Sequence, residues 1–180
     1  LFKAYRLSLE RAFIDADVEP ADISFIEANG SGKPEEDDIE ASVLQDWFSR
    51  PGAGEKKQCA LGSVKSVIGH TGAAAGLAGF VRTSLCLYQQ MIPPMAGFTE
   101  PARAWFEDSA FHIPRFPYYW LRNRIDGSRK SCTGVITRDG VCMHVISEEY
   151  NYPDDISPGL QQQIDIERRK VWLALPVLFE

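Results

Sequence analysis

Cysteine is scarce in this 180-residue chain, and the few cysteines lie far apart. No two of them form a CxxC pair, and no histidine stands near them at zinc-ligand spacing, which excludes a zinc finger and a disulfide scaffold. We therefore expect no bound metal, free thiols and a reducing, cytoplasmic setting. The cysteines are Cys59, Cys86, Cys132 and Cys142.

Long hydrophobic runs and clustered positive charge are also missing. The apolar stretch 171–179 is too short to cross a bilayer and contains Pro176, and no signal-peptide pattern opens the chain. Lys and Arg number 19 against 25 Asp and Glu, a net charge of −6, and the one basic cluster is 168–170. Neither nucleic acid nor a membrane is an expected partner.

The remaining composition is that of a folded domain, with 44% hydrophobic, 11% aromatic and 24% charged residues. Apolar residues spaced by three and four over residues 2–17 predict an amphipathic helix. The order of helices and strands predicts an α/β fold with a mixed sheet covered by helices. The expected strands are 23–28, 59–62, 131–137 and 141–148, with a hairpin turn at 138–140, and further helices are expected at about 35–47 and 71–90.

The helix expected at 71–90 is rich in glycine and alanine over its first turns. Each interior glycine costs about 1 kcal/mol relative to alanine, so such a composition makes sense where another backbone approaches closely. The sequence therefore predicts a buried Gly/Ala-rich helix.

Two loops follow predicted strands, at 27–32 and 62–71. Because ligands gather at the carboxyl ends of strands in open α/β sheets, we expect both loops to face one cleft. His70 stands at the mouth of a helix, where free N–H groups and the helix dipole favour an oxyanion and keep the imidazole neutral. Lys65 is expected to be buried by the same fold and to orient a neighbouring group. Asp37 and Glu40 are expected to cap or line the helix after the first loop.

These loops resemble the C-terminal half of a β-ketoacyl synthase, the condensing domain of fatty-acid and polyketide synthases. The family pattern VEAHGTGTxxGDxxE corresponds to IEANGSGKPEEDDIE at 26–40, and GSVKSNIGHTxAAAGxAG corresponds to the nearly unbroken GSVKSVIGHTGAAAGLAG at 62–79. The third pattern, GFGGTNAHV, corresponds to TRDGVCMHV at 137–145, which keeps little beyond its glycine and its final His-Val. The resemblance covers residues 1–150 and implies the C-terminal half of a thiolase-like fold.

In that family, a cysteine outside this segment carries the acyl chain, and two histidines stabilise the enolate formed by decarboxylation of a malonyl thioester. The resemblance implies that His70 is the second histidine, that Lys65 is a supporting active-site residue, and that Asn29 stands in place of the first histidine. Thr71, Arg138 and Gly140 are implied to contact substrate. No cofactor is implied; the substrates would ride on the phosphopantetheine of an acyl carrier protein.

Two functions remain open. The first is a ketosynthase-type acyltransferase that performs decarboxylative Claisen condensation, with Asn29 as a surrogate hydrogen-bond donor. The second is a catalytically inactive, chain-length-factor-like domain that pairs with an active ketosynthase, as in decayed ketosynthase domains of polyunsaturated fatty acid synthases. Asn29, Arg138 in place of a gating phenylalanine, and Cys142 favour the second, whereas Lys65 and His70 favour the first.

The expected domain organisation places a boundary near residue 150, followed by a linker and the start of another unit at 151–180. Because the chain begins at Leu1 inside a predicted helix, we expect it to be a piece of a longer polypeptide. Its expected partners are the other half of the ketosynthase domain, an acyl carrier protein, and a second ketosynthase-type domain in a dimer or pseudo-dimer.

Overall fold

The computed structural model describes residues 1–50, 58–101, 104–123, 125, 127–150, 159–160, 162–164 and 166–167. Its helices and strands follow the chain in this order: α1 (Phe2–Ala16), η1 (Pro20–Asp22), β1 (Ile23–Glu27), α2 (Pro34–Phe48), β2 (Cys59–Gly62), α3 (Lys65–Ile68), α4 (Ala74–Gln89), β3 (Met91–Ile92), η2 (Ala104–Asp108), β4 (Phe111–His112), β5 (Tyr118–Tyr119), β6 (Lys130–Ile136) and β7 (Cys142–Glu148). No helix within the described ranges is long and apolar enough to span a membrane.

A mixed five-stranded sheet forms the centre of the molecule, with strand order β4-β2-β1-β6-β7. β4, β2, β1 and β6 run parallel to their neighbours, while β7 pairs antiparallel to β6 as the second strand of a hairpin. The predicted α/β class, the mixed sheet and the 131–148 hairpin are confirmed. Because β1, β2 and β6 are parallel, their carboxyl ends and the loops that follow lie at one edge of the sheet.

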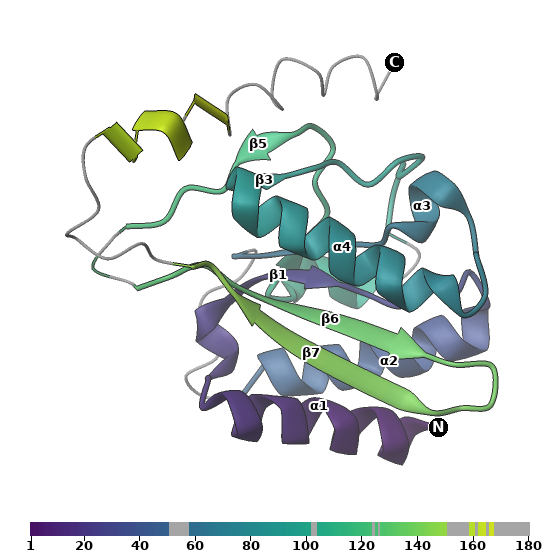
Figure 1. Ribbon diagram of the computed structural model, residues 1–180. Helices are drawn as coiled ribbons and strands as arrows, with labels where there is room; N and C mark the ends of the chain where they lie inside the picture. Colours follow the sequence, from purple (N-terminus) through teal and green to yellow (C-terminus); the bar gives the residue numbers. More distant parts are fainter. Residues whose placement is uncertain are drawn as a thin grey trace.

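Helices cover both faces of this sheet, with α1 and α2 on one side and α4 on the other (Figure 1). Three residues of the expected α1 pattern, Tyr5, Leu9 and Phe13, form its buried side. The first residue of that pattern, Phe2, is 42% exposed, so the buried side begins one turn later than expected. The three buried residues join the main core, where Phe13 packs edge-on against Trp47 and Phe48 of α2. α1 ends where Asp17 takes a left-handed conformation with φ 52°.

The Gly/Ala-rich helix α4 packs its small residues against the sheet and leaves its opposite face exposed. It begins at Ala74 rather than at residue 71, because residues 71–73 form a turn. Its small residues pack on the sheet: a Cβ on Gly76 would lie 3.0 Å from Val135 of β6, and one on Gly79 would lie 3.2 Å from Glu27 of β1. The opposite face exposes apolar side chains, with Leu77 at 67% and Leu85 at 52%.

The first part of the second motif, before α4, also differs from the loop expected there. The segment after β2 contains a short helix, α3, which begins at Lys65. The small sheet of β3 and β5, and the short strand β4, have no counterpart in the expected elements. Of the expected linker at 151–159, all but its last residue lies outside the described residues, and so does the apolar segment 171–179.

Candidate functional site

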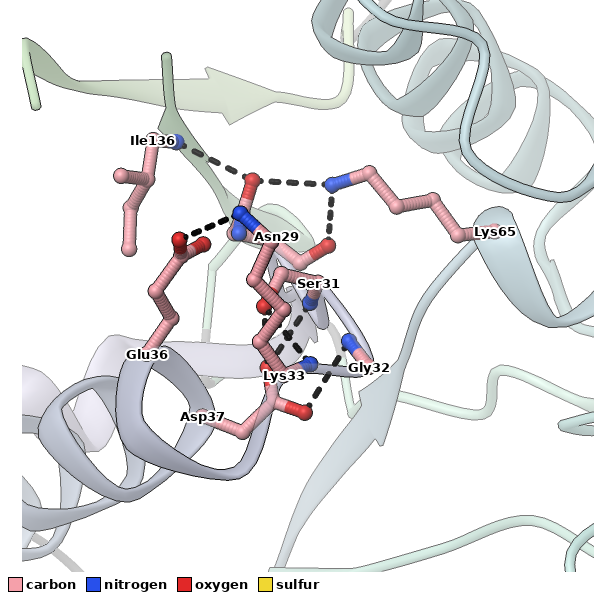
Figure 2. A network of polar contacts seen from close by, with 8 residues as sticks. All are labelled: Asn29, Ser31, Gly32, Lys33, Glu36, Asp37, Lys65 and Ile136. Atoms are coloured by element: carbon pink, nitrogen blue, oxygen red, sulfur yellow. Dashed lines mark hydrogen bonds and ion pairs between the residues drawn. The ribbon is translucent and has the colours of Figure 1, made fainter. Parts of the chain in front are cut away.

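Three loops at the carboxyl edge of the sheet meet at Asn29. This residue follows β1 and is only 2% exposed. Lys65, at the start of α3, reaches the Asn29 side chain from the segment after β2. The backbone of Ile136, the last residue of β6, reaches it from the strand end that leads into the third loop (Figure 2). The expectation that the first two motif loops share one site is therefore met by a direct contact between Lys65 and Asn29.

The amide of Asn29 is held in one orientation. Its Oδ1 accepts hydrogen bonds from Lys65 Nζ at 2.8 Å and from the Ile136 backbone N–H at 3.1 Å. Lys65 Nζ also donates to the backbone oxygen of Asn29. Both partners of Oδ1 can only donate, so a flipped amide would place its NH₂ group against two other donors, where no hydrogen bond can form. The Asn29 Nδ2 group is thereby turned away from Lys65 and is left to donate.

Carboxylates hold the backbone of the same loop. Glu40 of α2 is buried and accepts the Asn29 N–H at 2.7 Å and the Gly30 N–H at 2.8 Å. Asp37, one turn earlier, accepts the N–H groups of Ser31 at 2.8 Å and Gly32 at 3.1 Å. Asp37 lies along the helix as expected, whereas Glu40 is an interior anchor that the motif spacing alone did not identify.

A buried ion pair lies next to the backbone segment that carries Lys65. Glu27 of β1 binds Arg82 of α4, and their side chains are only 2% and 12% exposed. The other oxygen of Glu27 accepts the Val64 N–H just before α3. Burial raises the pKa of Glu27, and the nearby Arg82 opposes that rise. Glu27 therefore links β1 to α4 and to the backbone just before α3. These contacts hold the backbone at Lys65 in place.

Lys65 is half-buried and lies among carboxylates. Burial lowers its pKa, and attraction to Glu40 and Glu27 acts in the opposite direction. An ammonium here suits the two oxygens of Asn29 that it contacts, because a charged donor makes the stronger hydrogen bond. Lys65 thus contacts both oxygens of Asn29, and the orienting role expected for it stays a prediction.

His70 is exposed in this chain and sits just before the turn that leads into α4. Its Nδ1 accepts the Gly72 N–H at 3.1 Å. A neutral imidazole that accepts at Nδ1 carries its proton at Nε2, so the free nitrogen is a hydrogen-bond donor. The backbone N–H expected to serve an oxyanion thus serves the histidine itself and fixes its tautomer.

The remaining predicted site residues lie around this group without joining it. Thr71 is exposed between His70 and the turn. Arg138 is exposed in the tight turn between β6 and β7, which is closed by a hydrogen bond from Gly140 N to Thr137 O. Gly140 has φ 78°, a left-handed conformation that favours glycine. The third motif is therefore a compact hairpin turn.

A small polar cavity of about 10 Å³ lies beside Asn29 and Lys65. Glu27, Ser63 and Thr133 contribute to its walls, and the small residues of α4 close it. That volume suits about one water molecule and not an acyl group. Among the described residues there is no group of three or more His, Cys, Asp or Glu placed to hold a metal ion.

At the carboxyl edge of the mixed sheet, the first motif loop contacts the second through Asn29 and Lys65. His70 lies further along the second loop, at its exposed end. Residues 3–99 match the family described as Beta-ketoacyl synthase, C-terminal domain. The chain belongs to the β-ketoacyl synthase family and is part of a ketosynthase domain of the kind found in polyketide synthases.

Its relatives are much longer than the chain. It is 36% identical to the polyketide synthase ThaG of Burkholderia thailandensis over 148 residues, 82% of this chain and 3% of ThaG. It is 34% identical to the polyketide synthase PksL of Bacillus subtilis over 161 residues, 88% of this chain and 4% of PksL. The chain thus spans a small part of the synthases it matches.

Solved structures show the same relationship at the level of the fold. The ketosynthase from module 6 of the Bacillus subtilis bacillaene synthase superposes with a TM-score of 0.75 at 33% identity, covering 82% of this chain and 26% of the ketosynthase. The structure titled PfaC Keto synthase-Chain length factor superposes with a TM-score of 0.72 at 28% identity, covering 87% of this chain and 16% of that one.

Proposed function

We propose that this segment completes a ketosynthase-type acyltransferase site in which His70 and Asn29 donate hydrogen bonds to a thioester oxyanion and Lys65 orients Asn29. The observation that carries the proposal is the fixed amide of Asn29, whose Oδ1 is occupied by Lys65 and Ile136. The donor of that amide is left for a ligand. His70 Nε2, protonated because Nδ1 accepts from Gly72, supplies the second donor.

The reaction proposed for the complete domain is a decarboxylative Claisen condensation. Loss of CO₂ from a malonyl thioester leaves an enolate, whose oxygen the two donors stabilise. The enolate carbon attacks the carbonyl of an acyl-cysteine thioester and expels the cysteine thiolate. Both thioesters would be delivered on the phosphopantetheine of an acyl carrier protein, and the cysteine would come from the preceding half of the domain, which is not in this chain.

The amide limits the rate of this reaction. Asn29 can donate a hydrogen bond, but it cannot take up or release a proton near neutral pH as an imidazole does. Weakening one oxyanion donor costs about 3–4 kcal/mol of transition-state stabilisation, roughly 10² to 10³ in rate. We therefore expect condensation that is slower than with histidine at this position.

A chain-length-factor-like role is the second candidate. The compact 137–141 turn, with Arg138 exposed, is a poor counterpart of a flexible apolar gate. Similarity to a structure that contains both a ketosynthase and a chain length factor fits either function. In this role the segment would pair with an active ketosynthase, in a dimer or pseudo-dimer, and shape its acyl tunnel.

Malonyl decarboxylation and product formation by the intact synthase subunit separate the two candidates. We expect His70→Ala to abolish both and Asn29→His to raise condensation. His112→Asn is the matched control, because that histidine lies on β4, bonded to Tyr118, outside the Asn29 group. Unchanged product output in His70→Ala would overturn the catalytic proposal and favour the chain-length-factor-like role.

A further inference from the structure

Tyr5 of α1 reaches the Asn29 loop through Glu40. Its hydroxyl donates to Glu40 Oε1 at 2.6 Å, and its side chain is fully buried. The same oxygen accepts the Asn29 N–H at 2.7 Å, and the other oxygen accepts the Gly30 N–H at 2.8 Å. Tyr5 lies outside all three sequence motifs, yet only one carboxylate separates it from the loop.

The phenol of Tyr5 has a tightly defined place. The ring of His144 on β7 meets it edge-on, with 4.4 Å between ring centroids, and His144 Nδ1 is itself bound to Ser8 Oγ at 3.0 Å. Gly134, the cross-strand partner of His144, lies beside them: a Cβ there would be 2.8 Å from the Tyr5 hydroxyl. The hydroxyl therefore reaches Glu40 because β6 carries a glycine at that point.

We propose that Tyr5 is a positioning residue for the site: its hydroxyl holds the Glu40 carboxyl group in place, and Glu40 in turn holds Asn29 where its amide can serve the oxyanion. The chemical consequence rests on the function proposed above. The positioning itself rests only on the contacts of Tyr5, Glu40 and the loop.

The surroundings of Glu40 explain why one hydroxyl matters. Burial raises the pKa of Glu40, and the hydrogen bonds from Tyr5, Gly30 and Asn29 lower it. Loss of the Tyr5 hydroxyl would let Glu40 take up a proton at higher pH, and a protonated carboxyl is a weaker acceptor for two N–H groups. The other titratable groups facing Glu40 are Asp37 on α2, Lys65 on α3, Cys132 on β6 and Cys142 on β7.

The Tyr5 hydroxyl is a donor at neutral pH, because the ordinary pKa of a tyrosine already lies near 10. Burial raises the pKa of Tyr5 well above its usual value, and the charge of Glu40 raises it further. Glu40 is therefore the partner whose protonation responds to pH in this pair.

The first test measures malonyl decarboxylation by the intact subunit as a function of pH. We expect Tyr5→Phe to lower kcat about tenfold while KM stays within about twofold, and to move the acid limb of the kcat profile to higher pH. Thr83→Val is the matched control, because it removes a buried hydroxyl, bound to Thr133 Oγ1 at 3.1 Å, that does not touch the loop. An unshifted acid limb in an active Tyr5→Phe variant would overturn the proposal.

A double-mutant cycle tests the route through Glu40. Glu40→Gln keeps the shape of the side chain but cannot ionise, so adding Tyr5→Phe to it should change kcat by less than about twofold. A full, additive loss in the double variant would show that Tyr5 acts on the site by another route and would overturn the proposal.

Hydrogen–deuterium exchange of peptides covering 28–32 separates positioning from function and needs no catalytic activity. In Tyr5→Phe we expect faster exchange of the Asn29 and Gly30 amides, with Thr83→Val like the wild type. Unchanged exchange would refute the positioning role. Faster exchange in a subunit that shows no decarboxylation in any form would uphold the positioning role and refute the proposed function. Glu40→Gln serves the same measurement where Tyr5→Phe does not fold.

Discussion

At the scale of single residues, the contacts around Asn29 suit an amide side chain. Asn29 Oδ1 accepts hydrogen bonds from the Lys65 ammonium and the Ile136 backbone N–H. The backbone N–H of Asn29 donates to Glu40. An imidazole at this position would have one ring nitrogen facing Lys65 and would have to accept there. The Lys65 ammonium therefore sets which end of either side chain faces the ligand.

His144 provides a test of the interior at the same scale. Burial lowers its pKa to about 4. The unfolded chain, with a histidine pKa near 6.5, binds the proton more strongly, so stability rises with pH between about 4 and 6.5 and falls as pH drops through that window. The contribution lost at the acid end is about 3 kcal/mol.

We expect His144→Asn to flatten this part of the stability profile, because an amide can keep the bond to Ser8 Oγ but does not titrate. Urea unfolding of the complete domain at several pH values measures the difference between wild type and variant. Burial raises the pKa values of Glu27 and Glu40, so these carboxyls give stability a pH dependence opposite to that of His144. Their contributions are the same in wild type and variant and cancel when the two profiles are subtracted. Parallel wild-type and variant profiles between pH 4 and 6.5 would contradict this assignment.

At the scale of elements, the small residues of α4 set how closely the helix approaches the sheet. Gly76→Ala adds a methyl group 3.0 Å from Val135 Cγ2 while improving helix propensity by about 1 kcal/mol. These effects oppose each other, so we expect little net gain in the free energy of unfolding. In a Val135→Ala background the obstacle is gone, and the same substitution should stabilise by about 1 kcal/mol. Equal effects in the two backgrounds, measured by urea unfolding, would show that Val135 does not limit the approach.

The sequence predicts those elements whose pattern is local. The amphipathic period of α1, the short apolar run of β1 and the Arg-Asp-Gly turn of the β6–β7 hairpin are all confirmed. β4 and β5 have two residues each, which is too short to show a period. The face of α4 left exposed has no local signal either, because its side chains are as apolar as those of a buried helix.

The candidate site is predictable only in part for the same reason. The motifs identify Asn29, Lys65 and His70 as candidates. The contact from Ile136 uses its backbone N–H, which nearly every residue type has, so the sequence does not indicate it. The anchoring role of Tyr5 depends on α1 crossing beside α2, and the space for its ring depends on Gly134. Both are consequences of tertiary packing.

At the scale of the whole molecule, the two outer faces differ in chemistry. On the α1 side, isolated apolar residues such as Ile14 are exposed among charged neighbours. On the α4 side, exposed apolar residues continue from the helix onto strand β7: Leu77, Phe80, Val81, Leu85, Met143 and Val145. A continuous apolar surface of this kind is typical of an interface. Since the chain matches only about a quarter of a ketosynthase, we propose that the rest of the domain covers this face.

A matched pair of substitutions tests that difference between faces. Leu77 and Ile14 are almost equally exposed in this chain, at 67% and 69%. If the rest of the domain packs on α4, Leu77→Arg buries a charge in the complete domain and removes apolar contact, which should destabilise it by about 3 kcal/mol or more. Ile14→Arg, on the outer face of α1, should change stability by less than about 0.5 kcal/mol. Urea unfolding of the complete domain compares the two, and equal effects would place solvent, rather than the rest of the domain, against α4.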